Sequence, residues 1–128
     1  MAPFQVSIRS DKTRNVIYVE QAGRGEVRDI EGFIAAYRDA CRQVKAGFVL
    51  VNDQRKLEPY ADEALETVKQ LVALCNEYGM SHCIRIVADS LVTKTRISRI
   101  LVSTGPTYDN LRVNTPEEAE VLLRRLGH

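Results

Sequence analysis

Apolar and polar residues alternate at the start of the chain, in the pattern of a strand that is buried on one face. Phe4, Val6 and Ile8 are separated by single polar residues, which gives the two-residue period of a β-strand. A polar run over residues 11–15 follows, and a second β-rich run begins at Val16. Residues 3–22 are therefore predicted to form a β-hairpin.

Beyond the hairpin, helical periodicity alternates with short apolar runs. Apolar residues recur at helical spacing over residues 27–44, 65–75, 92–101 and 119–126, and each stretch predicts a helix. A continuous apolar run predicts a strand at residues 48–51, and a loop is expected at 54–60. Further strands are predicted at residues 83–87, which one charge interrupts, and at 108–113. Gly47, Gly79 and Gly105 stand where the first three helices end. Thr115 and Glu118 have the spacing of a capping box, which predicts the start of the fourth helix.

This order of elements predicts an α/β fold with a single mixed, mostly parallel sheet of about five strands, an N-terminal hairpin and four helices. Strands that alternate with helices are joined by right-handed crossovers, which leave neighbouring strands parallel. With 128 residues, the chain has room for one domain, and residues 1–128 are predicted to form it.

The composition excludes several classes of protein. Eighteen basic and 17 acidic residues leave a net charge of +1, so no nucleic-acid partner is expected. No apolar run approaches the length of a membrane span, and the first ten residues lack the pattern of a secretion signal. The three cysteines are widely spaced and odd in number, which favours reduced thiols and a cytoplasmic location.

The sequence offers no constellation typical of catalysis or metal binding. His82 and His128 are not paired with each other, and no Cys-x-x-Cys occurs, so neither a metal nor a cofactor is expected. Cys41 and Cys75 lie on apolar helical faces, and Cys83 points away from His82 across its strand. Core thiols are therefore favoured over a nucleophile. No catalytic residue is predicted, and the protein is not expected to be an enzyme.

A charged loop after the central strand is the first candidate for a binding surface. It carries Asp53, Arg55, Tyr60, Asp62 and Glu63. In an open α/β sheet, ligands bind beyond the carboxyl ends of the strands. The alternative is a solvated loop in which Asp62 and Glu63 favour the N-terminus of the next helix electrostatically.

A basic region is the second candidate. Residues 81–112 hold five basic and two acidic residues, and Lys94, Arg96 and Arg99 belong to the predicted third helix. They form either an ordinary polar helix face or a patch for an acidic partner or anion. Arg85 lies between two isoleucines in a predicted inner strand. It either pairs with a carboxylate such as Asp53, lies at a strand end, or orients an anion.

The order of these motifs resembles the STAS domain of anti-anti-sigma factors and sulfate-transporter tails, and most closely the small bacterial SpoIIAA-like proteins. The resemblance covers residues 15 to 128 and is carried by residues 47–53, 60–65, Gly79, 103–105 and 115–119. It implies a STAS-like regulatory or protein-interaction module. Regulatory STAS domains carry Asp-Ser-Ser-Gly at the start of the second helix, where one serine is phosphorylated. Here residues 61–64 read Ala-Asp-Glu-Ala, so the resemblance does not extend to that switch.

Two further functions remain open. The shape shared with CRAL-TRIO lipid-transfer domains implies a small anionic ligand or a lipid, in an apolar pocket near Phe33, Tyr60 and Leu101. An enzyme would need Arg85, Asp53 and Tyr60 to surround a small anion. The sequence offers no residue that would activate a nucleophile. The first strand is also expected at a sheet edge, where strands invite pairing, so both a monomer and a homodimer remain open.

Overall fold

One five-stranded sheet organises the protein. The computed structural model describes residues 2–88 and 108–128. Along the sheet the strands follow in chain order: β1 (Gln5–Asp11), β2 (Val16–Gly23), β3 (Val49–Leu57), β4 (His82–Ile86) and β5 (Asp109–Val113). β1 pairs antiparallel with β2, and every later pair is parallel. The predicted hairpin and the mostly parallel sheet are thus confirmed.

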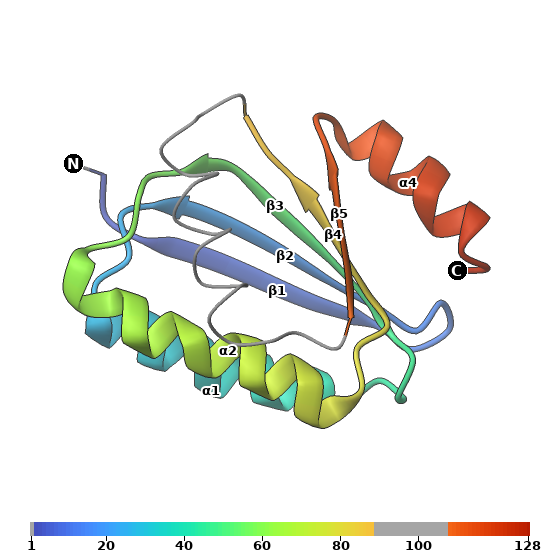
Figure 1. The fold of residues 1–128 in the computed structure, drawn as a ribbon, viewed down its shortest axis with the longest axis horizontal. Coiled ribbons are helices and arrows are strands. Elements are labelled where there is room, and N and C mark those ends of the chain that lie inside the picture. The colour runs from blue at the N-terminus through green and yellow to red at the C-terminus, as the bar shows by residue number, and fades with distance from the viewer. Residues whose placement is uncertain (1, 89–107) are drawn as a thin grey trace.

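Helices cover both faces of this sheet (Figure 1). α1 (Val27–Cys41) and α2 (Leu65–Tyr78) lie side by side on one face, and a 3₁₀ turn, η1 (Asp62–Ala64), precedes α2. α4 (Pro116–Arg125) packs on the other face, against β3, β4 and β5. The predicted α/β class is confirmed, and the helix expected at residues 92–101 lies outside the described residues. In the described ranges, no helix has the length and apolar character needed to cross a membrane.

Side chains divide into two cores because successive residues of a strand point to opposite faces of the sheet. The larger core lies under α1 and α2 and includes Ile17, Leu50 and Cys83. The smaller one lies under α4 and includes Val49 and Ile84. The continuous apolar run at the start of β3 therefore serves both faces at once, as the sequence pattern predicted.

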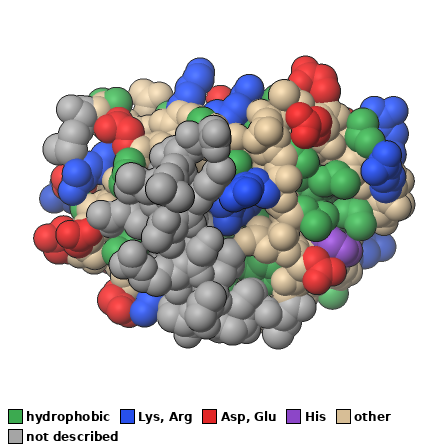
Figure 2. All heavy atoms as spheres, turned by 45° about the horizontal axis from the view of Figure 1, so that its top comes forward, with side chains coloured by type: hydrophobic (Ala, Val, Ile, Leu, Met, Phe, Trp, Pro, Cys, Tyr) green, Lys and Arg blue, Asp and Glu red, His purple; other side chains and the backbone are tan. Residues whose placement is uncertain are grey.

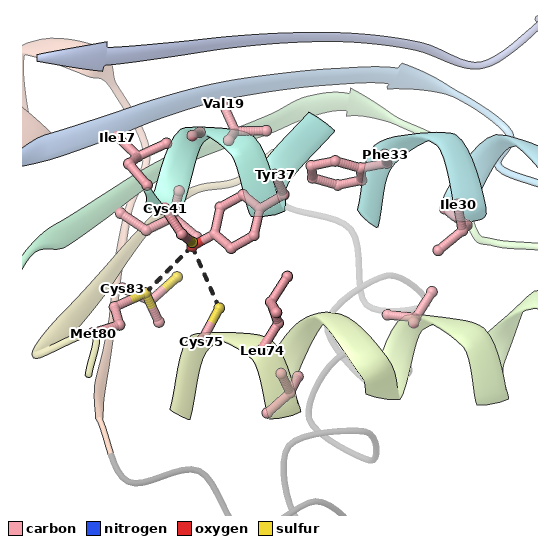
Figure 3. Close-up of a cluster of buried hydrophobic side chains, with 14 of the residues drawn as sticks. Ile17, Val19, Ile30, Phe33, Tyr37, Cys41, Leu74, Cys75, Met80 and Cys83 are labelled. Carbon is pink, nitrogen blue, oxygen red and sulfur yellow. Dashed lines mark hydrogen bonds between the residues drawn. The ribbon is translucent and has the colours of Figure 1, made fainter. Parts of the chain in front are cut away.

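The cysteines belong to the larger core, in which Tyr37 forms a contact between α1 and α2 (Figure 3). The Cys75 thiol donates to the Tyr37 hydroxyl at 3.4 Å, and that hydroxyl donates to the Met80 sulfur at 3.9 Å. Cys41, Cys75 and Cys83 are all buried and free of disulfides, and burial raises the pKa of each thiol to about 12. Core thiols, as predicted, are confirmed.

The predicted loop at residues 54–60 is wrong in its first half, because β3 continues to Leu57. The register shifts after the pair Glu20 and Asp53, where two residues of β3 stand opposite one residue of β2, so that Ala22 pairs with Lys56 and Gly23 with Leu57. This shift keeps the polar second half of β3 hydrogen-bonded to β2. Strand propensity alone does not predict this continuation of β3, since the residues after Val51 are mostly polar.

Two predicted helix boundaries are confirmed, at Gly79 and Thr115, but the predicted end of the first helix at Gly47 is wrong, because α1 ends at Cys41 with Arg42 as its C-cap. Gly79 ends α2 in the left-handed conformation, with φ of 78°, which glycine adopts without steric cost. The Thr115 hydroxyl accepts the Glu118 backbone N–H at 3.1 Å, at the start of α4. The Glu118 carboxylate contacts the same hydroxyl at 3.3 Å, which fixes the first turn of α4.

Candidate functional site

Four polar side chains form a row on the sheet face covered by α1 and α2, toward the carboxyl ends of the strands. This polar row consists of Gln21 on β2, Asn52 and Gln54 on β3, and Arg85 on β4. Asn52 lies directly beside Arg85 in the parallel register. The row replaces the apolar side chains that occupy the same face one pleat earlier, where Leu50 lies beside Cys83.

Hydrogen bonds order one half of the polar row. The Tyr60 hydroxyl donates to Gln21 Oε1 at 2.7 Å, and Gln21 Nε2 donates to Asn52 Oδ1 at 2.9 Å. Tyr60 and Gln21 are 5% and 1% exposed, so both side chains are held out of bulk water. The two bonds run in one direction, which leaves the Asn52 amide N–H₂ as the donor next to Arg85.

The other half of the row is buried and unpaired. Arg85 is 7% exposed, and its Nε has no hydrogen-bond partner in the described part of the chain. Gln54 is 6% exposed, and its Oε1 is likewise without a partner there. No salt bridge among the described residues involves Arg85, and burial, with the neighbouring charge of Arg112, lowers the pKa of its guanidinium. A buried, uncompensated cation is costly, which makes Arg85 a candidate for binding an anion.

The polar row opens into a cavity of about 80 Å³ between the sheet, α1 and α2. Most of its described lining is apolar, and Arg85 is the one charged residue in that lining. The described lining residues are Gln21, Phe33, Tyr37, Leu50, Asn52, Gln54, Tyr60, Val68, Leu71, Val72, Cys75, Met80, Cys83, Arg85, Tyr108 and Asn110. An apolar cavity with a few convergent polar groups is the usual form of a small-molecule site.

The described lining holds hydrogen-bond donors but no group suited to abstract a proton. Burial raises the pKa of Tyr60 and of Tyr108, so both phenols are neutral hydroxyls at physiological pH. No histidine or carboxylate lines the described part of the cavity, and its thiols are protonated. Among the described residues, no three metal-ligating side chains come together either. These groups suit the cavity to hold an anion.

The structure brings together two of the predicted site residues, Tyr60 and Arg85, in this cavity. Asp53 lies apart from them, because it points to the opposite face of the sheet, in register with Ile86. There its carboxylate accepts two hydrogen bonds from the Arg55 guanidinium, at 3.0 and 2.7 Å. Burial favours a higher pKa for Asp53, but the hydrogen bonds from Arg55 outweigh it and lower that pKa.

The expected pairing of Arg85 with Asp53 is therefore wrong. So is the arrangement of Arg85, Asp53 and Tyr60 around one anion, since the sheet separates Asp53 from the other two. The physical reason is parity along β3, where Asn52 and Gln54 face α1 and α2 while Asp53 and Arg55 face away.

The remaining predicted residues do not line the cavity. Arg55, Asp62 and Glu63 are exposed, and the latter two begin the 3₁₀ turn before α2. Lys94, Arg96, Arg99 and Leu101 lie outside the described residues. Figure 2 shows both basic and acidic side chains distributed over the face it presents, in keeping with the net charge of +1.

Sequence reasoning missed Gln21, Asn52 and Gln54. A usable signal existed, because Leu50, Asn52 and Gln54 are spaced two apart and share one face once β3 extends beyond Asp53. For Gln21, the run from Val16 to Val19 was recognised as β-rich. Gln21 lies two residues after Val19 and four after Ile17, so ordinary strand alternation places it on the same face as these two core residues.

Solved structures of other proteins have a similar fold, whereas sequence comparisons give no match. No protein-family model matches the chain, and no curated protein sequence matches it either. Its structure is similar to an uncharacterised protein of the DUF3478 family from Shewanella loihica, described as having a SpoIIAA-like fold. That match has a TM-score of 0.74 and 12% identity, and covers 96% of this chain and 97% of the other.

Two further matches are named as regulators. An anti-sigma factor antagonist from Mycobacterium paratuberculosis matches with a TM-score of 0.62 and 11% identity, over 95% of each chain. The anti-sigma factor antagonist SpoIIAA in its unphosphorylated form matches with a TM-score of 0.59 and 14% identity, over 96% of this chain and 97% of that one. The chain therefore has the SpoIIAA-like, or STAS-like, fold, as the sequence motifs indicated.

Proposed function

We propose that this protein is a non-enzymatic binding module that holds a small anionic ligand in the cavity at the polar row. The observation that carries this proposal is the buried guanidinium of Arg85, which is 7% exposed and whose Nε has no partner among the described residues. Buried charges in proteins are paired or coordinate a ligand. An anion beside Arg85 would supply the missing partner.

The position of the cavity supports the same function. It lies toward the carboxyl ends of β2, β3 and β4, where open α/β sheets bind their ligands. The described lining supports binding without chemistry, because its ionisable groups other than Arg85 are protonated phenols and thiols.

Thermal shift and native mass spectrometry test this function. We expect a panel of small inorganic and organic anions to contain members that raise the melting temperature of the wild type and form a one-to-one complex. The same anions should lose their effect on Arg85→Met and keep it on Arg125→Met, since Arg125 is exposed on α4, which covers the opposite face of the sheet. If no anion shifts the wild type, or if Arg85→Met responds equally, the proposal is wrong.

A second candidate function is a regulatory protein-interaction module. The names of two structural neighbours, both anti-sigma factor antagonists, favour it. The surface we propose for a protein partner carries Arg55, which is on β3 and faces away from the cavity, and Asp62 and Glu63, which are in η1; all three are exposed. The chain has no serine or threonine over residues 61–64, so such a role would not depend on phosphorylation there.

Co-purification from a native lysate tests the second candidate. We expect Glu63→Lys, and Arg96→Glu in the predicted third helix, to remove partners that the wild type retains. Identical partner lists for all three proteins would count against this surface. Sedimentation of the purified protein would decide in the same series whether β1, which is an edge strand, also mediates a homodimer.

A further inference from the structure

The side chains that line the cavity indicate the chemical class of the ligand as well as its charge. We infer that the cavity binds an amphiphilic monocarboxylate, whose carboxylate pairs with the Arg85 guanidinium and whose apolar body lies against the side chains of α1 and α2. This inference rests on the proposed anion-binding function and adds the identity of the head group and the need for an apolar tail.

The charge of the described lining matches a single negative charge. Arg85 is the one ionised side chain among the described lining residues, and its neighbours in the polar row are neutral amides. Arg112 lies beside it in the sheet but is exposed, so water and salt screen its charge. A monoanion would neutralise this cation. A phosphate monoester carries up to two charges at pH 7 and would leave part of its charge buried without a partner.

The geometry of the donors suits a planar acceptor. A guanidinium presents its N–H groups in a rigid planar fork, which matches the two oxygens of a carboxylate. The Asn52 amide lies beside Arg85 in the sheet and is the donor end of the hydrogen-bond chain from Tyr60. Gln54 contributes a second amide, whose oxygen has no partner among the described residues. With the amide turned so that its N–H₂ faces the ligand, Gln54 would donate to the same carboxylate.

The other side chains that line the cavity favour a ligand with an apolar body. Phe33 comes from α1, and Val68, Leu71 and Val72 come from one face of α2. A cavity of about 80 Å³ has room for several water molecules, but apolar walls hold water poorly. An alkyl chain attached to the carboxylate would occupy this space and bury apolar surface.

Calorimetric titration with straight-chain carboxylates tests the inference. Acetate, butyrate, hexanoate and octanoate are titrated into the wild-type protein, with hexanol and hexyl phosphate as matched head-group controls. We expect affinity to rise about fourfold for each methylene until the cavity is filled. Hexanoate should bind at least tenfold more tightly than hexanol or hexyl phosphate.

Three variants assign the binding to this site. Arg85→Met removes the cation and should abolish hexanoate binding. Arg85→Lys keeps the charge without the fork and should weaken binding at least tenfold. Gln54→Leu should weaken it less, and it keeps the test valid if the Arg85 variants do not fold. Arg125→Met, on the exposed side of α4 across the sheet, is the matched control and should bind hexanoate like the wild type.

The outcomes separate this inference from the proposed function. Tighter binding of hexyl phosphate than of hexanoate would overturn the monocarboxylate while leaving an anion site. Equal binding of hexanol and hexanoate, or affinity independent of chain length, would also overturn it. Loss of hexanoate binding in Arg125→Met but not in Arg85→Met would show that hexanoate binds at another site. If no anion of any kind binds the wild type, the proposed function itself fails.

Discussion

The Tyr60 hydroxyl donates a 2.7 Å hydrogen bond to the side-chain oxygen of Gln21, 39 residues earlier in the chain. Through this contact the segment after β3 is joined to the end of β2. It also fixes the Gln21 amide so that its N–H₂ donates to Asn52, the direct neighbour of Arg85. The order of the cavity therefore depends on a bond that no local sequence pattern specifies.

Removing the Tyr60 hydroxyl should destabilise the protein. Tyr60→Phe leaves the buried Gln21 oxygen without its donor, which costs about 1–3 kcal/mol of unfolding free energy. Urea unfolding with an unchanged m-value measures this loss. Tyr78→Phe is the matched control, since Tyr78 is partly buried against the same core and its hydroxyl bonds to none of the described residues. Equal effects of the two substitutions would contradict the proposed importance of the Tyr60 bond.

Removing the buried charge should stabilise the ligand-free protein. Arg85→Met replaces an unpaired buried cation by an apolar side chain of similar length, and we expect a gain of about 1 kcal/mol in unfolding free energy. Thermal and urea unfolding without added ligand measure it. Arg112→Met, at the exposed neighbouring position, should change stability by less than about 0.5 kcal/mol. A clear loss of stability in Arg85→Met would show that the guanidinium already has a stabilising partner.

Two glycines provide a matched steric test near the cavity. A Cβ added at Gly25 would lie 2.9 Å from Ile30 Cδ1 and 3.0 Å from Tyr60 Cδ1, so Gly25→Ala should cost about 1–3 kcal/mol. A Cβ at Gly32 in α1 meets no atom within 4 Å. Gly32→Ala should therefore stabilise the helix, by about 0.5–1 kcal/mol. Denaturant unfolding compares the pair, and the same sign for both would refute the steric argument.

An ion pair on the opposite face of the sheet predicts a pH dependence. Arg14 and Glu120 form a salt bridge at 2.9 Å, and the hydrogen bond from Arg14 lowers the pKa of Glu120 below its ordinary 4.5. Because the folded pKa is the lower one, the contribution is complete above about pH 4.5 and is lost as the pH falls through the folded value. Both groups are partly exposed, so Glu120→Gln should cost about 0.5 kcal/mol at pH 7.

Unfolding experiments at pH 7 and pH 3 measure this dependence. The difference between the wild type and Glu120→Gln should be present at pH 7, shrink at pH 3, and decrease at high salt. Glu117→Gln, three residues earlier in α4 and absent from the described salt bridges, is the control. A difference that grows on acidification would have the wrong sign for this pair.

The three cysteines should resist thiol reagents in the folded protein. Burial raises the pKa of Cys41, Cys75 and Cys83 to about 12, so these thiols stay protonated at pH 8. Native protein should label slowly with a disulfide reagent, and urea-unfolded protein should expose three reactive thiols at once. Rapid stoichiometric labelling of the native state would show that one thiol is accessible.

Most of the elements followed from local patterns, which is why they were predictable. The hairpin, α1, α2 and α4 each carry a hydrophobic period that matches one geometry, and Gly79 marks a helix end because glycine tolerates positive φ. The carboxyl half of β3 was not predictable in this way. Its polar residues remain in a strand because pairing with β2 continues beyond the irregular register at Glu20.

Part of the candidate site was likewise predictable from the sequence, and part was visible only in the tertiary structure. The sequence alone marked Arg85 as a charge in an inner strand and Tyr60 as a residue near the strand end, and it fixed the fold class that gives both a context. Tertiary structure decided that Arg85 lies beside Asn52 and that Asp53 faces the other side of the sheet. The reason is that the two-residue period of a strand determines which of its residues share a face, whereas the register between two strands depends on pairing between distant segments of the chain. A shift of one residue would exchange the faces.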